Sequence, residues 1–397
     1  MRGLDYFNCF PLRRNDSEQD FAKIMAAKVE SEINDALFRL ALNALKEKPC
    51  ESAVVSPLSV GMALATVNSG AKGLTSQEIT EAAFAGIPKN QITAWFRQRI
   101  AELREEGTSS PLSIASAIYL ERTLGLVERY QTDLQQNFDS EVKRVDFTIE
   151  PEVQREVMNK FVEEATKGKI PELFAEGVIT SDTRIVAVNA MHLKTNFDQE
   201  FNKELTKDDA FHNEDGSAKQ VPTMNGTKKG QFLENDDFAY AEFPFVDNGF
   251  HFFFAVPKTG RLADLKDKFY KTTHSIAYTT SESTYIPYIH MTLPKFKTQA
   301  DYSLQDALEK HGIREMFAPE KADFSGIADE PISVDSVIHQ AVFELNEDGV
   351  EAAAATALKM CQRCLELSQD ERHIKADRPF LYGVTFKGAP VFVGQYY

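Results

Sequence analysis

The stretch that decides the fold runs Asn346-Glu-Asp-Gly-Val-Glu-Ala-Ala-Ala-Ala-Thr-Ala-Leu-Lys-Met-Cys-Gln-Arg-Cys364. In an extended strand, successive side chains point to opposite faces. The even positions from Val350 to Met360 carry no charge, whereas the odd positions include Glu351, Lys359 and Arg363. This stretch can therefore lie inside a sheet with one face buried and its charges in water.

A helix is the alternative for this stretch, because alanine is the best helix former and local propensity alone favours a helix. Two flanking features favour an extended loop. Gly349 precedes the alanines as a permissive hinge, and the polar residues 366–372 follow them. We therefore predict a long exposed loop whose first half can join a sheet.

The hinge motif Asn346–Gly349, the alanines after it and the later motif Ala376–Phe380 resemble the reactive-centre loop and following strand of the serpins, a family of serine protease inhibitors. The Arg363-Cys364 pair is similar to that of the intracellular, ovalbumin-like branch. Further serpin-like motifs occur upstream in serpin order: Ser56–Ser59, Gly70–Gly73, Thr166–Ile170, Asn189–Lys194, Leu293–Phe296, Ala322–Gly326 and His339–Ala341. Chance does not readily produce so many ordered matches.

The resemblance covers about residues 32–397 and implies the serpin fold. That fold is α+β, with several helices around a large central mixed sheet and two smaller sheets, and with an exposed reactive-centre loop at about residues 346–378. Residues 1–31 are expected to be an N-terminal extension, partly helical or disordered. The sequence has no linker-like composition and no repeat, which favours one large domain over several.

Periodicity also indicates mixed secondary structure. Apolar residues three or four apart predict an amphipathic helix or helix pair over residues 21–45. Thr75 and Glu78 have the spacing of a capping box at a helix start. Residues 185–188 and 250–256 are typical of buried strands. Because the strands do not alternate regularly with helices, the pattern favours α+β over a doubly wound sheet.

Composition limits the partners. The chain has 44 Lys and Arg against 60 Asp and Glu, a net charge of −16, which disfavours nucleic acid and anionic membranes. The first 14 residues lack the apolar core of a secretory signal, and no stretch is long enough to span a bilayer. Four cysteines are too few for a disulfide framework. We therefore expect a cytoplasmic monomer, with a secreted form left open.

Motifs of enzymes are missing: there is no nucleophile elbow, no glycine-rich phosphate loop and no paired-histidine metal signature. The scattered histidines, His212, His251, His274 and His311, are expected to be surface or packing residues. We therefore predict no enzymatic activity, no catalytic residue, no cofactor and no metal site.

The resemblance assigns structural roles to particular residues. A hinge is expected at Glu347, Gly349, Val350, Ala352, Ala353, Ala354 and Ala355. A hydrogen-bonded group beneath the opening of the central sheet, the shutter, is expected at Ser56, Ser59, Asn189 and His339. Glu347 is expected to pair with Lys295 at the top of the loop. Phe161 and Phe197 stand where the family usually has tryptophan.

The resemblance also implies the mechanism. A protease cleaves the exposed loop, and the cut loop inserts into the sheet as a new strand, a known example of strand addition. The bond fourteen residues beyond Gly349 is Arg363-Cys364, and an arginine there suits a trypsin-like serine protease. Met360, Leu365 or Leu367 are alternatives for a chymotrypsin-like target. Inhibition of papain-like cysteine proteases and a non-inhibitory binding or chaperone role stay open.

Cys361 and Cys364 form a Cys-x-x-Cys motif across the expected bait bond. Two unrelated thiols are the simpler interpretation, because a redox motif normally lies at a strand-to-helix junction. A disulfide between them is nevertheless within reach and would tether the two sides of the cut. The sequence therefore leaves open an oxidative switch of inhibition.

Overall fold

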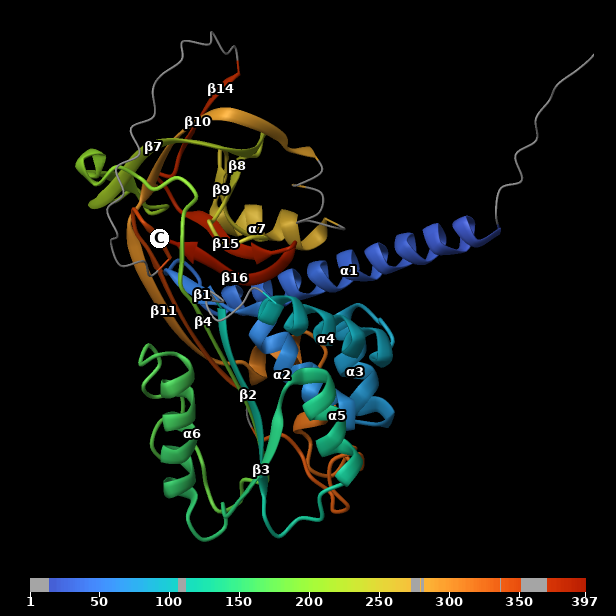
Figure 1. Ribbon diagram of the computed structural model, residues 1–397. Coiled ribbons are helices and arrows are strands. Elements are labelled where there is room, and N and C mark those ends of the chain that lie inside the picture. The colour runs from blue at the N-terminus through green and yellow to red at the C-terminus, as the bar shows by residue number, and fades with distance from the viewer. Residues whose placement is uncertain (1–13, 106–111, 273–278, 280–281, 336, 351–369) are drawn as a thin grey trace, which may run out of the picture.

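The computed structural model describes residues 14–105, 112–272, 279, 282–335, 337–350 and 370–397 (Figure 1). Its helices lie mostly in the first half of the chain, and its strands dominate the second half. The α-helices are α1 (Arg14–Lys46), α2 (Pro57–Gly70), α3 (Gly73–Phe84), α4 (Lys89–Glu105), α5 (Glu128–Phe138), α6 (Pro151–Ala165), α7 (Leu262–Lys271) and α9 (Gln305–Lys310). Two 3-10 turns are η1 (Lys203–Leu205) and η2 (Glu315–Phe317).

One large sheet is formed mainly by strands from the second half of the chain. Its order is β1-β16-β15-β9-β8-β7-β10-β14, and β6 also pairs with β7. Every residue of β15 and β16 is buried, as the apolar sequences of these strands require. The bounds are β1 (Ala53–Val55), β6 (Lys207–His212), β7 (Ala218–Glu234), β8 (Phe238–Pro244), β9 (Phe250–Pro257), β10 (Thr284–Pro294), β14 (Glu371–Lys375), β15 (Phe380–Phe386) and β16 (Ala389–Tyr396).

The remaining strands form two ladders. One has the order β11-β12-β13-β5 and the other β3-β2-β4. Their bounds are β2 (Leu112–Glu121), β3 (Glu141–Val145), β4 (Ile185–Leu193), β5 (Thr195–Asn196), β11 (Phe296–Ser303), β12 (Ile338–Leu345) and β13 (Gly349–Val350). Strand β12 packs close to β4, but the described residues form no hydrogen-bonded ladder between these two strands. We call this junction the β4/β12 boundary.

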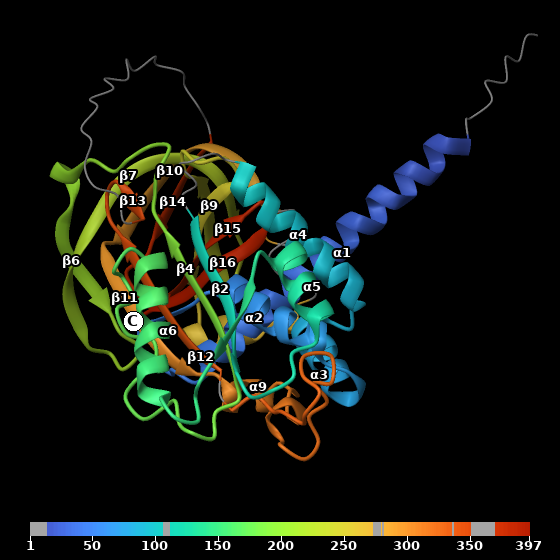
Figure 2. The same ribbon diagram turned by 60° about the horizontal axis from the view of Figure 1, so that its bottom comes forward.

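Helix α6 covers one face of these strands (Figure 2). Met158 and Val162 of α6 pack with Tyr119, Val186 and Val188 in an apolar cluster of their own. The opposite face of the strands contributes to the main core, where Ala341, Phe343 and Leu345 of β12 are buried. The alternating burial of β12 is therefore the period-two pattern of a strand with two unlike faces.

The structure confirms the α+β class and both predicted strands, which are β4 and β9. Residues 21–45 lie in one continuous helix, α1, rather than in a pair. The predicted capping box is wrong. Lys72 is the N-cap residue of α3, and Thr75 instead donates to Glu315 Oε1 over 3.1 Å. These contacts are made with a distant segment near residue 315, and the spacing of Thr75 and Glu78 could not reveal them.

The N-terminal half of α1 extends away from the body of the molecule (Figure 1). Ile24 and Met25 on this part are 65% and 42% exposed. The helix crosses position 31 without a break, so the helical part of the expected extension is continuous with the domain. None of the described helices combines the length and the apolar character that crossing a bilayer requires.

Candidate hinge, shutter and reactive segment

The hinge is a tight turn between β12 and β13. The side-chain oxygen of Asn346 accepts hydrogen bonds from the backbone amides of Asp348 at 3.0 Å and Gly349 at 3.1 Å. Asparagine favours such turns because its side chain can replace a backbone acceptor. The turn brings Val350 into register with Leu345 of β12. Val350 pairs on its other side with Thr195 of β5 and is only 2% exposed.

Gly349 is required by this geometry. Its φ of +147° lies in a region that side chains with a Cβ rarely adopt. A Cβ at this position would also come within 2.3 Å of the backbone oxygen of Thr195. The hinge can therefore reach β5 only because residue 349 is glycine.

Glu347 is held by two partners on other elements. Its Oε2 accepts from Lys295 Nζ at 2.9 Å, and its Oε1 accepts from Thr206 Oγ1 at 2.9 Å. Burial alone raises the pKa of this carboxyl, but the hydrogen bonds from Lys295 and Thr206 outweigh burial and leave the pKa below its usual value. The expected contact between Glu347 and Lys295 is thus present, with Thr206 as an additional donor.

Asp348 and the backbone of the turn complete the attachment. Asp348 accepts from Lys203 Nζ at 2.8 Å, and its side chain is only 9% exposed. The backbone oxygens of Glu347 and Asp348 accept from the amides of Phe201 and Phe197, each at 2.8 Å. Phe197, one of the two positions where tryptophan was expected, is 1% exposed and stacks on Phe245. The turn is therefore fixed by both main-chain and side-chain contacts.

The four predicted shutter residues lie together behind the β4/β12 boundary. Ser56 is the N-cap of α2 and is followed by Pro57, a favourable start for a helix. Its backbone amide donates to His339 Nε2 at 3.0 Å. Ser59, one turn later, donates through Oγ to Asn189 Oδ1 at 2.7 Å. A helix start thus links β12 to β4, the two strands that share no ladder.

The hydrogen bonds of the shutter depend on His339, a buried and uncharged histidine. Burial lowers the pKa of His339 to about 4, so its imidazole is uncharged near neutral pH and Nε2 can accept the amide proton of Ser56. Asn189 differs, because its buried Nδ2 has no hydrogen-bond partner among the residues that the structure describes. An unsatisfied buried donor is costly, and it marks a place where an incoming acceptor would be favourable.

The other predicted site residues lie outside the described residues. These are the alanines of the hinge, Ala352, Ala353, Ala354 and Ala355, the bait residues Arg363 and Cys364, and Cys361 with its proposed oxidation. The bait bond and the parity of the inserted face therefore stay predictions.

One cluster was missed by the sequence analysis. His290 on β10 and Glu371 and His373 on β14 bring their ligand atoms within 4.8 Å of one another. About eighty residues separate the two strands in the sequence, and no linear spacing connects them. Only the pairing of β10 with β14 reveals the cluster.

Residues 31–397 match the family model described as Serpin (serine protease inhibitor). The chain belongs to the serpin family. The ladders that flank the β4/β12 boundary are thus parts of the central sheet of a serpin.

The relatives of this serpin include protease inhibitors. Leukocyte elastase inhibitor A of Rattus norvegicus is 31% identical over 359 residues, with 88% of this chain and 93% of the relative covered. Among solved structures, Arabidopsis AtSerpin1 in its native stressed conformation has a TM-score of 0.81 and 25% identity, covering 93% of this chain and 98% of that one. Thyroxine-binding globulin in complex with thyroxine has a TM-score of 0.78 at 24% identity, covering 92% and 98%.

Two conclusions follow from the family. Serpins as a class inhibit proteases and are not enzymes themselves, which agrees with the missing catalytic motifs. Some members are not inhibitors, so the fold does not by itself determine what this serpin binds.

Proposed function

We propose that this serpin inhibits trypsin-like serine proteases, with Arg363-Cys364 as the bait bond. After cleavage, residues 351–362, the first part of what we call the reactive segment (residues 351–369), would insert into the β4/β12 boundary. The observation that carries the proposal is the hinge. Val350 already pairs with Leu345 on one side and Thr195 on the other, so the first residue of an inserted strand is in its place between two strands.

The register of the hinge indicates where each later residue would go. Continuing both ladders two residues at a time places Ala352 between Phe343 and Leu193. Ala354 then falls between Ala341 and Met191. All four of these neighbours on β12 and β4 are at most 5% exposed. Small uncharged side chains suit such positions, whereas a charge there would be buried without a partner.

The same register brings Thr356 between His339 and Asn189. A threonine hydroxyl both donates and accepts hydrogen bonds, so it can accept from the unpaired Nδ2 of Asn189. Each backbone hydrogen bond of the new strand adds roughly 0.5–1.5 kcal/mol net, so a strand of such length gains on the order of 10 kcal/mol. A gain of this size supports displacement and distortion of a covalently attached protease.

The choice of target rests on Arg363. A guanidinium in the specificity pocket of a trypsin-like protease meets a carboxylate in a charge-assisted hydrogen bond. The relatives that inhibit leukocyte elastase suggest a second possibility for the bait bond. In that alternative, Met360, Leu365 or Leu367 is the bait residue for a chymotrypsin-like protease. Papain-like cysteine proteases remain a further class to test. The low number of cysteines supports our expectation that the protein works in a reducing compartment.

A protease panel tests the proposal. The protein is incubated with trypsin-like, chymotrypsin-like and papain-like enzymes, complexes that survive SDS are detected, and the cut is located by mass spectrometry. We expect stable complexes with trypsin-like enzymes and a cut after Arg363. Loss of the charge-assisted contact, worth roughly 1.5–3 kcal/mol, should slow association of Arg363→Ala by one to two orders of magnitude.

Lys359→Ala is the matched control, because it removes a nearby cation from the same segment and should leave the association rate unchanged. A cut after another residue, with normal inhibition by Arg363→Ala, would contradict the bait assignment. Cleavage without complexes and without a rise in thermal stability would show that no insertion occurs. That result would favour a non-inhibitory binding or chaperone role.

A further inference from the structure

Three side chains with metal-binding groups meet on the outer face of the large sheet, where β10 pairs with the edge strand β14. His290 Nε2 lies 3.5 Å from Glu371 Oε2. The imidazole rings of His290 and His373 stack with centroids 4.7 Å apart and an interplanar angle of 19°. The ligand atoms of all three lie within 4.8 Å of one another.

The strand register creates this cluster. His290 pairs directly with His373 in a parallel ladder, and Glu371 lies two positions before His373 on the same face. The alternate positions of β10 and β14 face inward, where Ile289 and Ile374 are buried. The backbone ladder therefore fixes the relative positions of the three residues, and their side chains meet on the solvent side.

A second contact orients one of the imidazoles. Thr227 on β7 lies opposite His290, and its Oγ1 is 2.9 Å from His290 Nδ1. When Nδ1 donates its proton to this hydroxyl, Nε2 is left unprotonated toward Glu371. Histidines that bind metals commonly have their other ring nitrogen fixed by such an outer partner. Thr227 thus supplies the support that a loose surface histidine lacks.

We propose that His290, His373 and Glu371 form a binding site for a divalent transition metal, with Zn²⁺ as the best match. Two imidazoles and a carboxylate are ligands typical of zinc, whereas calcium and magnesium prefer oxygen alone. Ligand atoms on a tetrahedron with bonds of about 2.1 Å lie about 3.4 Å apart. The His290–Glu371 spacing already has this value, and a solvent molecule completes the coordination.

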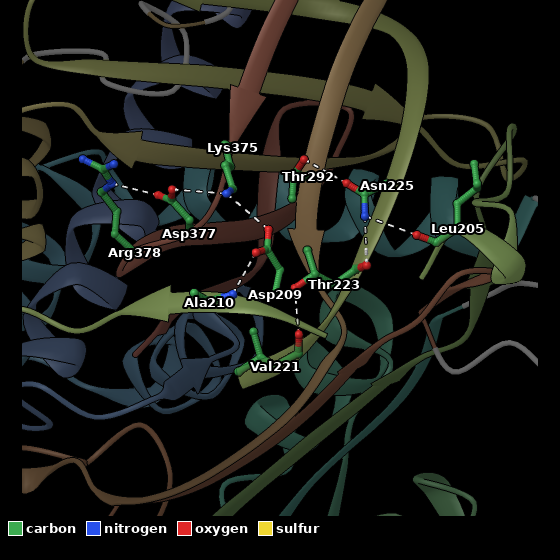
Figure 3. A network of polar contacts seen from close by, with 10 residues as sticks. All are labelled: Leu205, Asp209, Ala210, Val221, Thr223, Asn225, Thr292, Lys375, Asp377 and Arg378. Carbon is green, nitrogen blue, oxygen red and sulfur yellow. Dashed lines mark hydrogen bonds and ion pairs between the residues drawn. The ribbon is translucent and has the colours of Figure 1, made fainter. Parts of the chain in front are cut away.

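The site has a mechanical consequence, because it joins β14 to β10. Among the described strands, β14 is the edge of its sheet and pairs only with β10. Its C-terminal end is held by polar contacts (Figure 3): Lys375 Nζ lies 3.2 Å from Asp209 Oδ2 and 3.7 Å from Asp377 Oδ2. The metal acts at the opposite end of β14, next to the reactive segment.

The regulatory role rests on the proposed loop insertion. Insertion of an uncleaved segment has to draw β14 away from β10, because the segment leads directly into β14. Cleaved insertion leaves β14 in place. Bound Zn²⁺ therefore opposes spontaneous insertion without opposing inhibition.

Zinc binding is the direct test. The protein is stripped with a chelator, its four cysteines are alkylated to remove thiol ligands, and Zn²⁺ is titrated at pH 7.5 against a chromophoric competitor. We expect one Zn²⁺ per chain. Since even an outer partner of a zinc ligand changes affinity by roughly 10–100-fold, His373→Ala and His290→Ala should weaken binding at least that much.

His212→Ala is the control, because His212 is an exposed histidine on β6 away from the cluster. It should bind Zn²⁺ like the native chain. Because the two ligand histidines face solvent, far-ultraviolet circular dichroism should show both ligand variants folded. Failure to bind Zn²⁺, or equal affinity in His373→Ala, overturns the site.

The effect of Zn²⁺ on spontaneous insertion is tested separately from Zn²⁺ binding. The uncleaved protein is warmed with and without Zn²⁺, and its conversion to a loop-inserted, protease-resistant form is timed. We expect Zn²⁺ to slow conversion of the native chain and not of His373→Ala. If the protein binds Zn²⁺ but converts at an unchanged rate, only the proposed effect on spontaneous insertion is overturned. Zinc binding by a protein that forms no protease complexes leaves the site intact and counts only against the proposed inhibitory function.

Discussion

The two ends of the reactive segment are attached in different ways. At the start, Val350 is paired on both sides, and Glu347 and Asp348 are buried with charged partners. At the end, β14 is an edge strand that pairs with one strand in the described part of the chain, and its outward side chains are exposed. The hinge is thus continuous with the ladder of β12 and β5, whereas β14 belongs to the other sheet.

This difference separates two processes that the same segment could undergo. A cut segment can extend from the hinge into the β4/β12 boundary without moving β14. An uncut segment cannot insert fully unless β14 detaches. Under the proposed mechanism, we expect the double-sided hinge to promote insertion after cleavage and the hold on β14 to limit insertion before it.

The largest effect is expected from Ala354→Arg. The extended register places residue 354 between the buried residues Ala341 and Met191, and an unpaired buried charge costs several kcal/mol. Insertion should slow until the serpin becomes a substrate, so that cleavage continues while SDS-stable complexes disappear. Glu351→Arg is the control, since the same register places residue 351 on the other face, beside the half-buried Glu344 and the exposed Lys194. Equal loss in both variants would contradict the register.

A smaller effect is expected from Gly349→Ala. The added Cβ meets the backbone of Thr195 at 2.3 Å and the φ of +147° adds strain, so Val350 should leave β5. Backbone strain of this kind costs roughly 1–3 kcal/mol. Hydrogen exchange of the Val350 amide should accelerate. Gly216→Ala is the control. Its φ is also positive at +85°, but nothing lies within 4 Å of the added Cβ, so this substitution strains the backbone without a steric clash. Unchanged exchange in Gly349→Ala would show that the hinge tolerates displacement.

Acid should weaken the shutter through His339. Its pKa in the folded protein is about 4, below the ordinary 6.5, so the unfolded chain binds the proton first as pH falls. Stability is therefore complete above pH 6.5 and is lost between pH 6.5 and 4, at most about 1.4 kcal/mol for each pH unit. Denaturant unfolding at several pH values measures this slope. In His339→Gln, which keeps an acceptor for Ser56, the slope should flatten, and an identical slope would assign the acid sensitivity to other groups.

The smallest effect is expected from Glu347→Gln. Lys295 is 46% exposed, and ion pairs so accessible to water contribute about 0–1 kcal/mol. The amide keeps the shape of Glu347 and an acceptor for Thr206, so the hinge should loosen only slightly and heat-induced polymers should increase modestly. Size-exclusion chromatography after graded heating measures them. Identical polymer yields for the native chain and this variant would show that the charge does not matter to the hinge.

Local patterns could predict part of the fold and, within the hinge, the glycine at position 349. Helix α1 and strand β9 follow from periodicity, and Gly349 with the uncharged even positions indicated an insertable segment. The shutter residues could not be grouped from spacing, because Ser56 and His339 are 283 positions apart. A resemblance to a family supplied that group. It could not supply the His290 cluster, which depends on the pairing of two particular strands.

The capping-box error has the same physical origin. Thr75 and Glu78 have the right spacing for mutual capping, but both bind segments near residue 315 instead. Short-range rules fail where distant chain segments offer buried polar groups better partners.

Strands β15 and β16 have a consequence for how the chain is made. They are buried along their whole length and lie between β1 and β9, the former near the beginning of the chain. Ser52 donates to the backbone oxygen of Tyr397, 345 positions away. During synthesis, β1 and β9 therefore leave the ribosome long before the strands that join them. The nascent chain must therefore stay unfinished, with apolar strands of the large sheet unprotected, until residues 380–396 arrive.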